Sequence, residues 1–244
     1  MFPTLNPHLA TLNPSMHICL LDIDGTLVLT GGAGQTAFAD TLAADFGIPE
    51  ILTKVAFAGR SDRAIVADLF RDHGVEPSDE NWQRFCVGYL GRLDDALVRH
   101  RGHVLPGVGE LLEALAARGD VAIGLLTGNV REGARRKLSH YQLWHWFPFG
   151  GFGDDHAERC DIAAAALAAA KLHLNGSAAQ GEIVVIGDTH HDVNCGRSIG
   201  ARCVAVATGH TPVDELHAAK PDVLVDTLET LAPIMALFDA GRRN

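Results

Sequence analysis

Two pairs of aspartates stand where apolar runs of this sequence end. Asp22 and Asp24 close one run, and Asp188 and Asp192 follow another. If both runs are parallel strands, the four carboxylates lie at the same edge of a sheet, where such folds bind ligands. Carboxylates so close repel one another unless a cation joins them, and Mg²⁺ prefers oxygen ligands that include substrate phosphate. The pattern therefore predicts a magnesium site that receives a phosphate group.

Two further segments offer groups that an anion needs. The tripeptide Thr127-Gly128-Asn129 ends a third apolar run and opens a helical pattern, whose free N–H groups can hold phosphate oxygens. The same tripeptide is also a good helix cap. Arg159 precedes an alanine-rich helical pattern and can reach the same edge as a fixed positive charge. Taken singly, it is more simply explained as a surface arginine.

Five short apolar runs without polar alternation recur along the chain. Such runs suit strands that are buried on both faces, as in a parallel sheet covered by helices. Helical patterns of apolar residues lie between them. We therefore predict an α/β fold built on a doubly wound, Rossmann-like parallel sheet. The runs cover residues 17–22, 121–127, 182–188, 203–208 and 222–226.

One interval between the predicted strands is too long for a single crossover. A βαβ step uses about 30 residues, whereas positions 27 and 127 are 100 residues apart. The excess shows apolar residues at helical spacing, interrupted by Gly or Pro. We therefore predict a helical domain at 33–100, inserted into a core that comprises 16–32 and 101–244. A loose, proline-containing tail is expected at 1–15.

The polar segments resemble the four ordered motifs of the haloacid dehalogenase-like (HAD) hydrolases, and the resemblance spans about 17–230. The first and fourth motifs are specific, whereas the second and third are weak alone. The inserted helical segment resembles the cap of the phosphoglycolate phosphatase-like subgroup. The matching segments are D-x-D-G-T-L at 22–27, Thr127-Gly128-Asn129, the basic residue Arg159, and G-D-T-x-x-D at 187–192.

Two positions in this resemblance need comment. The third motif usually carries Lys, so Arg159 must serve here; its competitor Lys171 lies about three turns into the predicted helix, further from the sheet edge. Gly59-Arg60-Ser61-Asp62 resembles the substrate-side turn of the cap, which implies a substrate contact for Arg60. The alternative is a helix start capped by Ser61 or Asp62.

The resemblance implies a Mg²⁺-dependent phosphatase that forms an aspartyl-phosphate on Asp22. Asp24 would protonate the leaving oxygen and later activate water. Mg²⁺ would be held by the carboxylates of Asp22 and Asp188 and by the backbone carbonyl of Asp24. Asp192 would orient Arg159 or a metal-bound water.

The implied substrate is a small phosphate ester, either phosphoglycolate-like or a sugar phosphate. Thr127, Asn129 and the amides near Gly128 would contact its phosphate oxygens. Arg159 would offset the charge of the transition state. The side chains that select the rest of the molecule would come from the cap, starting with Arg60.

Three alternatives stay open. A sugar-phosphate mutase uses the same core and differs in which hydroxyl accepts the phosphoryl group. A haloacid dehalogenase would have no use for Asp24 or Asp188, because halide needs neither protonation nor Mg²⁺. A non-catalytic phosphate-binding module would need Asp22 without the acid two positions later.

Composition limits the partners. Thirty acidic and 20 basic residues leave a net charge of −10, which argues against nucleic acid as a partner. No apolar run approaches the roughly 20 residues that cross a membrane. Five widely spaced cysteines without a C-x-x-C pair fit a reducing cytoplasm. Nothing in the sequence defines an oligomeric state.

Overall fold

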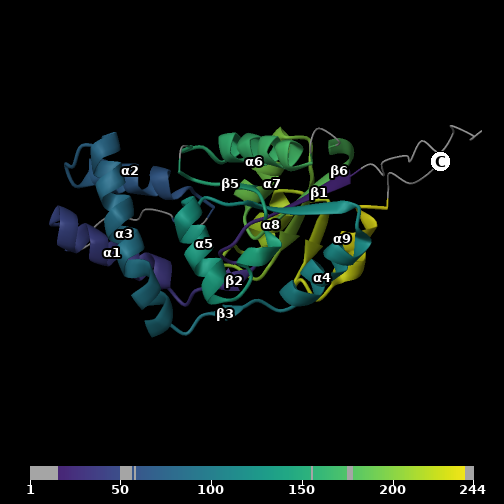
Figure 1. The fold of residues 1–244 in the computed structure, drawn as a ribbon, viewed down its shortest axis with the longest axis horizontal. Coiled ribbons are helices and arrows are strands. Elements are labelled where there is room, and N and C mark those ends of the chain that lie inside the picture. Colours follow the sequence, from purple (N-terminus) through teal and green to yellow (C-terminus); the bar gives the residue numbers. More distant parts are fainter. Residues whose placement is uncertain (1–15, 50–56, 58, 155, 175–177, 240–244) are drawn as a thin grey trace, which may run out of the picture.

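Six parallel strands form the central sheet of the structure, a computed structural model that describes residues 16–49, 57, 59–154, 156–174 and 178–239 (Figure 1). The spatial order is β5-β4-β1-β6-β7-β8. The chain therefore adds β4 and β5 on one side of β1 and then returns to add β6, β7 and β8 on the other side. This confirms the predicted α/β fold. The strands are β1 (Met16–Leu21), β4 (Val121–Leu126), β5 (Gly150–Gly151), β6 (Ala178–Gly187), β7 (Arg202–Val206) and β8 (Val223–Val225).

Alternate residues of β1 face opposite sides of the sheet, and helices cover both. Cys19 and Leu21 pack into the apolar cluster that includes α4, α5 and α9, whereas Ile18 and Leu20 pack into the cluster that includes α6 and α7. A continuously apolar strand is what this two-sided burial requires. The core helices are α4 (Val108–Arg118), α5 (Arg131–His140), α6 (Arg159–His173), α7 (His190–Ser198), α8 (Val213–Ala218) and α9 (Leu231–Ala236), with a 3₁₀ turn at Trp144–Trp146.

Three of the described helices, which follow β1 and precede α4, gather at one end of the molecule (Figure 1). They are α1 (Ala33–Phe46), α2 (Asp62–Asp72) and α3 (Asp79–Arg99). Their apolar side chains form a cluster of their own, built around Phe38, Phe85 and Tyr89, which Val130 joins from the core. The rings of Phe38 and Tyr89 pack edge to face, with centroids 4.8 Å apart.

A short antiparallel ribbon stands where the chain leaves the core for these helices and where it returns. β2 (Val28–Leu29) pairs with β3 (His103–Val104). Two-residue strands are too short to show a period of two, so the sequence analysis does not predict them. The predicted domain boundaries near 33 and 100 lie just inside the ribbon and stay a prediction, while the predicted tail at 1–15 lies outside the described residues.

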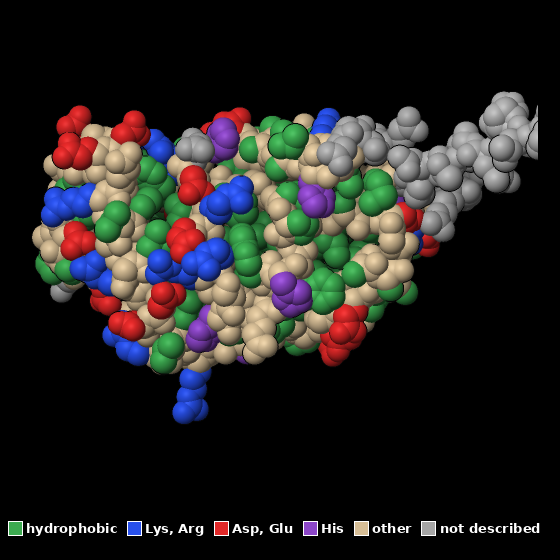
Figure 2. All heavy atoms as spheres, viewed as in Figure 1, with side chains coloured by type: hydrophobic (Ala, Val, Ile, Leu, Met, Phe, Trp, Pro, Cys, Tyr) green, Lys and Arg blue, Asp and Glu red, His purple; other side chains and the backbone are tan. Residues whose placement is uncertain are grey.

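Acidic and basic side chains are interspersed on the face shown in Figure 2, including the helical end of the molecule. Figure 2 shows no large patch of one charge among the described residues on this face. Among the described ion pairs, Arg136 of α5 pairs with Asp94 of α3 at 2.8 Å and with Glu132 at 2.9 Å. Among the helices that the structure describes, none is long and apolar enough to cross a membrane.

The packing of α3 leads to a matched pair of stability predictions. Leu93 is fully buried, whereas Val98 on the same helix is 77% exposed. We expect Leu93→Ala to lower the free energy of unfolding by about 2–5 kcal/mol, because it removes buried methyl groups and leaves a cavity. Val98→Ala should change it by less than about 0.5 kcal/mol. Urea denaturation of both variants tests this, and similar losses would contradict the described orientation of α3.

Candidate active site

The carboxyl ends of β1, β4 and β6 open into one cavity of about 600 Å³. Asp22 follows β1, Thr127 follows β4 and Asp188 follows β6, while Arg159 enters from the first residue of α6. The Asp22 backbone N–H donates to the Ile186 carbonyl at 3.0 Å, so the parallel pairing continues up to this point. The sheet therefore brings together the strand-end residues that the sequence analysis singled out.

Three carboxylates lie close together at the carboxyl edge of the sheet, and two of them, Asp22 and Asp188, line the cavity. Asp22, Asp188 and Asp192 each offer an oxygen, and these oxygens lie within 4.8 Å of one another. All three residues are buried. Burial raises the pKa of Asp22, against the opposing effect of Arg159; burial and then the charges of Asp192 and Asp22 raise the pKa of Asp188. Such a cluster of hard oxygen donors, short of positive charge, fits a divalent cation such as Mg²⁺.

Arg159 is the cation that faces this cluster. Its guanidinium forms an ion pair with Asp192 and lies 3.4 Å from Asp22. Burial by itself would lower the pKa of Arg159, but the two carboxylates outweigh it and the pKa is raised. Its Nε has no hydrogen-bond partner among the described residues. By contrast, Lys171 is exposed in the last turn of α6 and does not line the cavity.

Asp192 is held from its own helix as well as by Arg159. Thr189 is the N-cap of α7, and its hydroxyl and backbone N–H donate to an Asp192 oxygen at 2.6 and 3.0 Å. This capping box fixes the side chain before any ligand binds. The predicted orienting contact between Asp192 and Arg159 is thus present in the structure, whereas its role in catalysis stays a prediction.

Two glycines let the backbone close around Asp188. A Cβ on Gly25 would lie 2.4 Å from an Asp188 oxygen, and a Cβ on Gly209 would lie 1.7 Å from it. Gly25 also has a φ of 86°, which favours glycine. Any larger residue at either position would displace the carboxylate.

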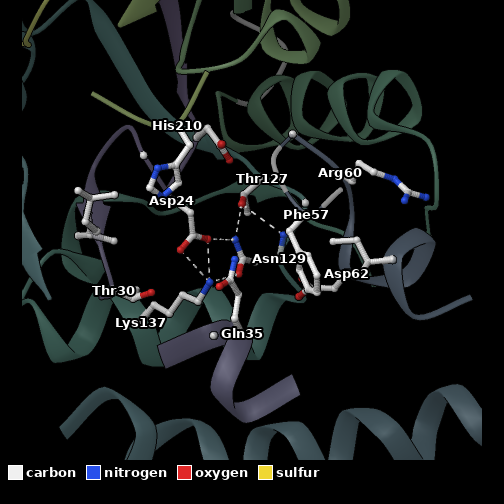
Figure 3. A pocket seen from close by; sticks show the side chains of 18 of the residues that line it. Asp24, Thr30, Gln35, Phe57, Arg60, Asp62, Thr127, Asn129, Lys137 and His210 are labelled. Atoms are coloured by element: carbon white, nitrogen blue, oxygen red, sulfur yellow. Dashed lines mark hydrogen bonds and ion pairs between the residues drawn. The ribbon is translucent and has the colours of Figure 1, made fainter. Parts of the chain in front are cut away.

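The Asp24 side chain points toward Lys137 and Asn129 (Figure 3). Both of its oxygens contact the Lys137 ammonium, at 2.7 and 2.9 Å, and one accepts a hydrogen bond from the Asn129 amide at 2.8 Å. Its side chain is 43% exposed, in contrast to the buried Asp22. The two aspartates of the first motif therefore lie in different environments.

The sequence analysis missed Lys137. It lies inside a helix, away from the strand ends where ligand-binding residues were sought. A signal for it does exist, because Gly133, Ala134, Lys137 and Leu138 are the buried positions of α5. A lysine on the inward face of an amphipathic helix needs a buried partner.

The turn at 59–62 lies directly over these strand ends. The Asp62 backbone N–H donates to the Gly128 carbonyl at 2.8 Å, and an Asp62 carboxylate oxygen accepts from the Val130 N–H at 2.9 Å. A Cβ on Gly128 would come within 2.2 Å of the Arg60 carbonyl oxygen. Burial raises the pKa of Asp62 to about 6. Gly128 thus permits a close approach between the two segments.

Arg60 borders the cavity, but its guanidinium extends away from Asp24 and Thr127 (Figure 3). It pairs with Asp68 of α2 at 2.6 Å. Ser61 caps α2 by accepting from the Ala64 N–H, so the helix-start interpretation describes the resting geometry of this segment. The substrate contact predicted for Arg60 would require the pair with Asp68 to rearrange.

Residues between β2 and β3 supply a largely apolar part of the cavity lining. Phe38, Phe57 and Ile65 form it, together with Tyr89 and the polar Gln35. A ligand in the cavity would therefore contact a mainly apolar surface. Tyr89 on this surface is 1% exposed, and its hydroxyl has no hydrogen-bond partner among the residues that the structure describes.

This fold and site define a class of protein. It is that of the hydrolases with a parallel sheet that hold carboxylates and a cation at the carboxyl edge of the sheet. The sequence profile of the family described as haloacid dehalogenase-like hydrolase matches residues 19–206. The chain belongs to this family.

Relatives and solved structures agree with this assignment. A phosphoglycolate phosphatase from Synechococcus elongatus is 29% identical over 216 residues, which cover 87% of this chain and 93% of the relative. A phosphoglycolate phosphatase from Nitrosococcus oceani is 26% identical over 212 residues, or 86% and 92% of the two chains. A Pseudomonas syringae hydrolase superposes with a TM-score of 0.68 at 23% identity, covering 91% and 98%. CbbY from Rhodobacter sphaeroides, solved in complex with phosphate, has a TM-score of 0.65 at 20% identity, covering 89% and 96%.

The carboxylate cluster leads to a prediction about metal-free stability. At pH 8, Asp188→Asn should raise the melting temperature in EDTA, because burial raises the pKa of Asp188 to about 8 and asparagine removes the cost of bringing that carboxyl into the folded protein above its ordinary pKa. The same variant should lose most of the stabilisation by Mg²⁺, which for a bound cation at 100 times its Kd is about 2.7 kcal/mol. Thermal denaturation with EDTA or Mg²⁺ measures both effects.

Glu113→Gln is the matched control, because Glu113 is an exposed acid of α4. It should leave both the metal-free melting temperature and the Mg²⁺ response unchanged. An Asp188→Asn protein that melts below the wild type in EDTA and keeps its full Mg²⁺ response would rule out a metal at this cluster.

Proposed function

We propose that this protein is a Mg²⁺-dependent phosphatase that hydrolyses a small phosphomonoester through an aspartyl-phosphate on Asp22. One observation carries the proposal: the buried side chains of Asp22, Asp188 and Arg159 lie close together at the carboxyl edge of the sheet, beside Thr127. Family membership and the names of the relatives support the same reaction class.

The residues present fit a magnesium ion. The Asp22 and Asp188 carboxylates and the Asp24 backbone carbonyl would hold it, and Asp192 lies close enough to orient a bound water. When bound, Mg²⁺ would neutralise the repulsion between the phosphate dianion and the carboxylates and would polarise the phosphoryl oxygens. Burial and then neighbouring carboxylates raise the pKa of Asp188, and burial raises the pKa of Asp22 against the effect of Arg159. These raised pKa values support the assignment, because a bound cation would stabilise the ionised carboxylates that burial disfavours.

The chain's own residues would then carry the reaction in two halves. An Asp22 oxygen forms a bond to phosphorus as the bond from phosphorus to the leaving oxygen breaks. Asp24 donates its proton to that leaving oxygen, and the alcohol departs. Asp24 next takes a proton from a water, which attacks the aspartyl-phosphate, so that inorganic phosphate leaves and Asp22 is regenerated.

The remaining contacts would serve the phosphoryl group and the leaving group separately. Thr127 and the backbone amides near Gly128 would donate to transferring oxygens, while Arg159 would offset developing charge. We propose that residues 33–100 form a cap over the cavity and that its apolar wall limits substrates to small esters. The unpartnered Tyr89 hydroxyl offers a hydrogen bond to a polar group on the leaving alcohol.

A panel that contains phosphoglycolate, sugar phosphates and 4-nitrophenyl phosphate tests this proposal. We expect the wild type to release phosphate with Mg²⁺ and not with EDTA. Asp22→Asn should abolish turnover, because the nucleophile is lost. Asp24→Asn should lower turnover about 10²- to 10⁴-fold, which is the range of general acid-base catalysis.

Two controls make the outcome specific. Glu113→Gln should retain the wild-type rate, and isomerisation of the sugar phosphates should be assayed beside phosphate release to separate a mutase from a phosphatase. Full activity of Asp22→Asn, or no phosphate release from any ester by the wild type, would contradict the proposal.

Arg159 and Lys171 are the two candidates for the basic residue of the third motif. Arg159→Ala should lower kcat/KM by about 10²- to 10³-fold, the usual cost of losing a charge-stabilising donor. Lys171→Ala should have no measurable effect, because this lysine is exposed and remote from the cavity. Steady-state kinetics decide between them, and a larger loss in Lys171→Ala would reverse the assignment.

A further inference from the structure

Lys137 is a charged residue on the buried face of helix α5. It is 4% exposed and lies on the inward face of the helix with Ala134 and Leu138. An ammonium group taken out of water costs several kcal/mol unless its charge and all its donors are matched. Its partners should therefore indicate why the position holds a lysine.

The three donors of the ammonium have three acceptors. Lys137 Nζ lies 2.9 Å from Asp24 Oδ1, 2.7 Å from Asp24 Oδ2 and 2.6 Å from Asn129 Oδ1. A lysine ammonium has three N–H donors, so the set is complete. Every polar contact of this buried lysine is thus directed to two residues of the candidate active site.

Asn129 extends the contact across the site. With its carbonyl oxygen on Lys137, its amide nitrogen donates to Asp24 Oδ2 at 2.8 Å and to Thr127 Oγ1 at 2.9 Å (Figure 3). Lys137 therefore determines which way the Asn129 amide points. Together they hold both Asp24 oxygens at a defined place relative to Thr127.

The Asp24 carboxylate needs such support. It stands on a turn with its side chain 43% exposed, and no other residue that the structure describes forms a hydrogen bond or ion pair with it. Lys137 forms no such contact with Asp22 or Arg159 within the described residues. The structure thus separates an Asp22–Arg159 pair at the phosphoryl end from an Asp24–Lys137 pair at the leaving-group end.

We propose that Lys137 is a positioning residue that holds Asp24 in place for proton transfer to the leaving oxygen. The inference rests on the proposed phosphatase activity and on Asp24 as its acid. It has a specific consequence, because only leaving groups that need a proton depend on where Asp24 lies. A nitrophenolate departs readily without one, whereas a phenolate, with the pKa of a tyrosine side chain near 10, is a poorer leaving group.

The test compares two aryl esters of nearly equal size, 4-nitrophenyl phosphate and phenyl phosphate, in the full-length protein with Mg²⁺. Lys137→Met should lower kcat/KM for phenyl phosphate by about 100-fold, the lower end of the range for general acid catalysis, and for 4-nitrophenyl phosphate by less than about 5-fold. Lys171→Met is the matched control and should retain both values, because Lys171 is exposed. Equal losses with the two esters, or no loss, would overturn the proposal.

A second readout separates positioning from a general structural role. In the Asp24→Asn background, Lys137→Met should cost no further kcat/KM for phenyl phosphate, since the group that it positions is already disabled. If Lys137→Met acts through a general structural effect, it should lower kcat/KM by the same factor in the Asp24→Asn background as in the wild type. That result would overturn the proposal. Lys137→Gln, which keeps a donor near Asp24, covers the case in which Lys137→Met does not fold, and unfolding of both variants would show that Lys137 is structural.

Failure of the two proposals can be told apart. If the wild type hydrolyses neither aryl ester nor any member of the panel, the phosphatase proposal is wrong, and the role of Lys137 in it is wrong too. If the wild type is active and Lys137→Met lowers both esters equally, only the role of Lys137 is wrong.

Discussion

The electrostatic crowding of three buried carboxylates against one arginine is the constraint on which the rest of this structure depends. Among the described residues, Arg159 is the one buried cation that pairs with this cluster of Asp22, Asp188 and Asp192, so the cluster carries an excess of negative charge when its carboxylates are ionised. Such an arrangement costs stability unless a cation completes it. The surrounding backbone maintains the crowding, because Gly25 closes in on Asp188 and the capping box of α7 fixes Asp192.

A second charge pair gives Asp24 a different environment from Asp22, although only one residue separates them. Asp22 is buried beside Arg159, whereas Asp24 is half exposed and paired with Lys137. Two carboxylates with distinct surroundings can take distinct roles in one reaction, one as nucleophile and one as acid and base. The acidic net charge of the chain argues against polyanions as partners, yet within this site each acid has a local use.

The parts of the site that follow strands or lie in the first turn of the next helix could be predicted, whereas Lys137, further along a helix, could not. Asp22, Thr127 and Asp188 each end a buried strand, and a parallel sheet brings such positions to one edge. Lys137 gave no such signal, because a lysine in a helix is usually solvated and only its inward register marks it. The pairing of Arg60 with Asp68 depends on the tertiary path of the turn before α2, which local sequence does not encode.

The inserted helices and helix α5, which carries Lys137, are linked by a hydrogen bond from a backbone N–H to a carboxylate. Asp62, the first residue of α2, accepts from the N–H of Val130, which is the N-cap of α5. Helix α5 in turn carries Lys137 to Asp24. The N-terminus of α5 thus has one acceptor from α2 and a second from Asp154, which accepts from the Arg131 N–H at 2.7 Å. The position of α2 is therefore coupled through Val130 to the helix that brings Lys137 to Asp24, so in the proposed mechanism the segment that covers the cavity also contacts the helix that holds the proposed acid.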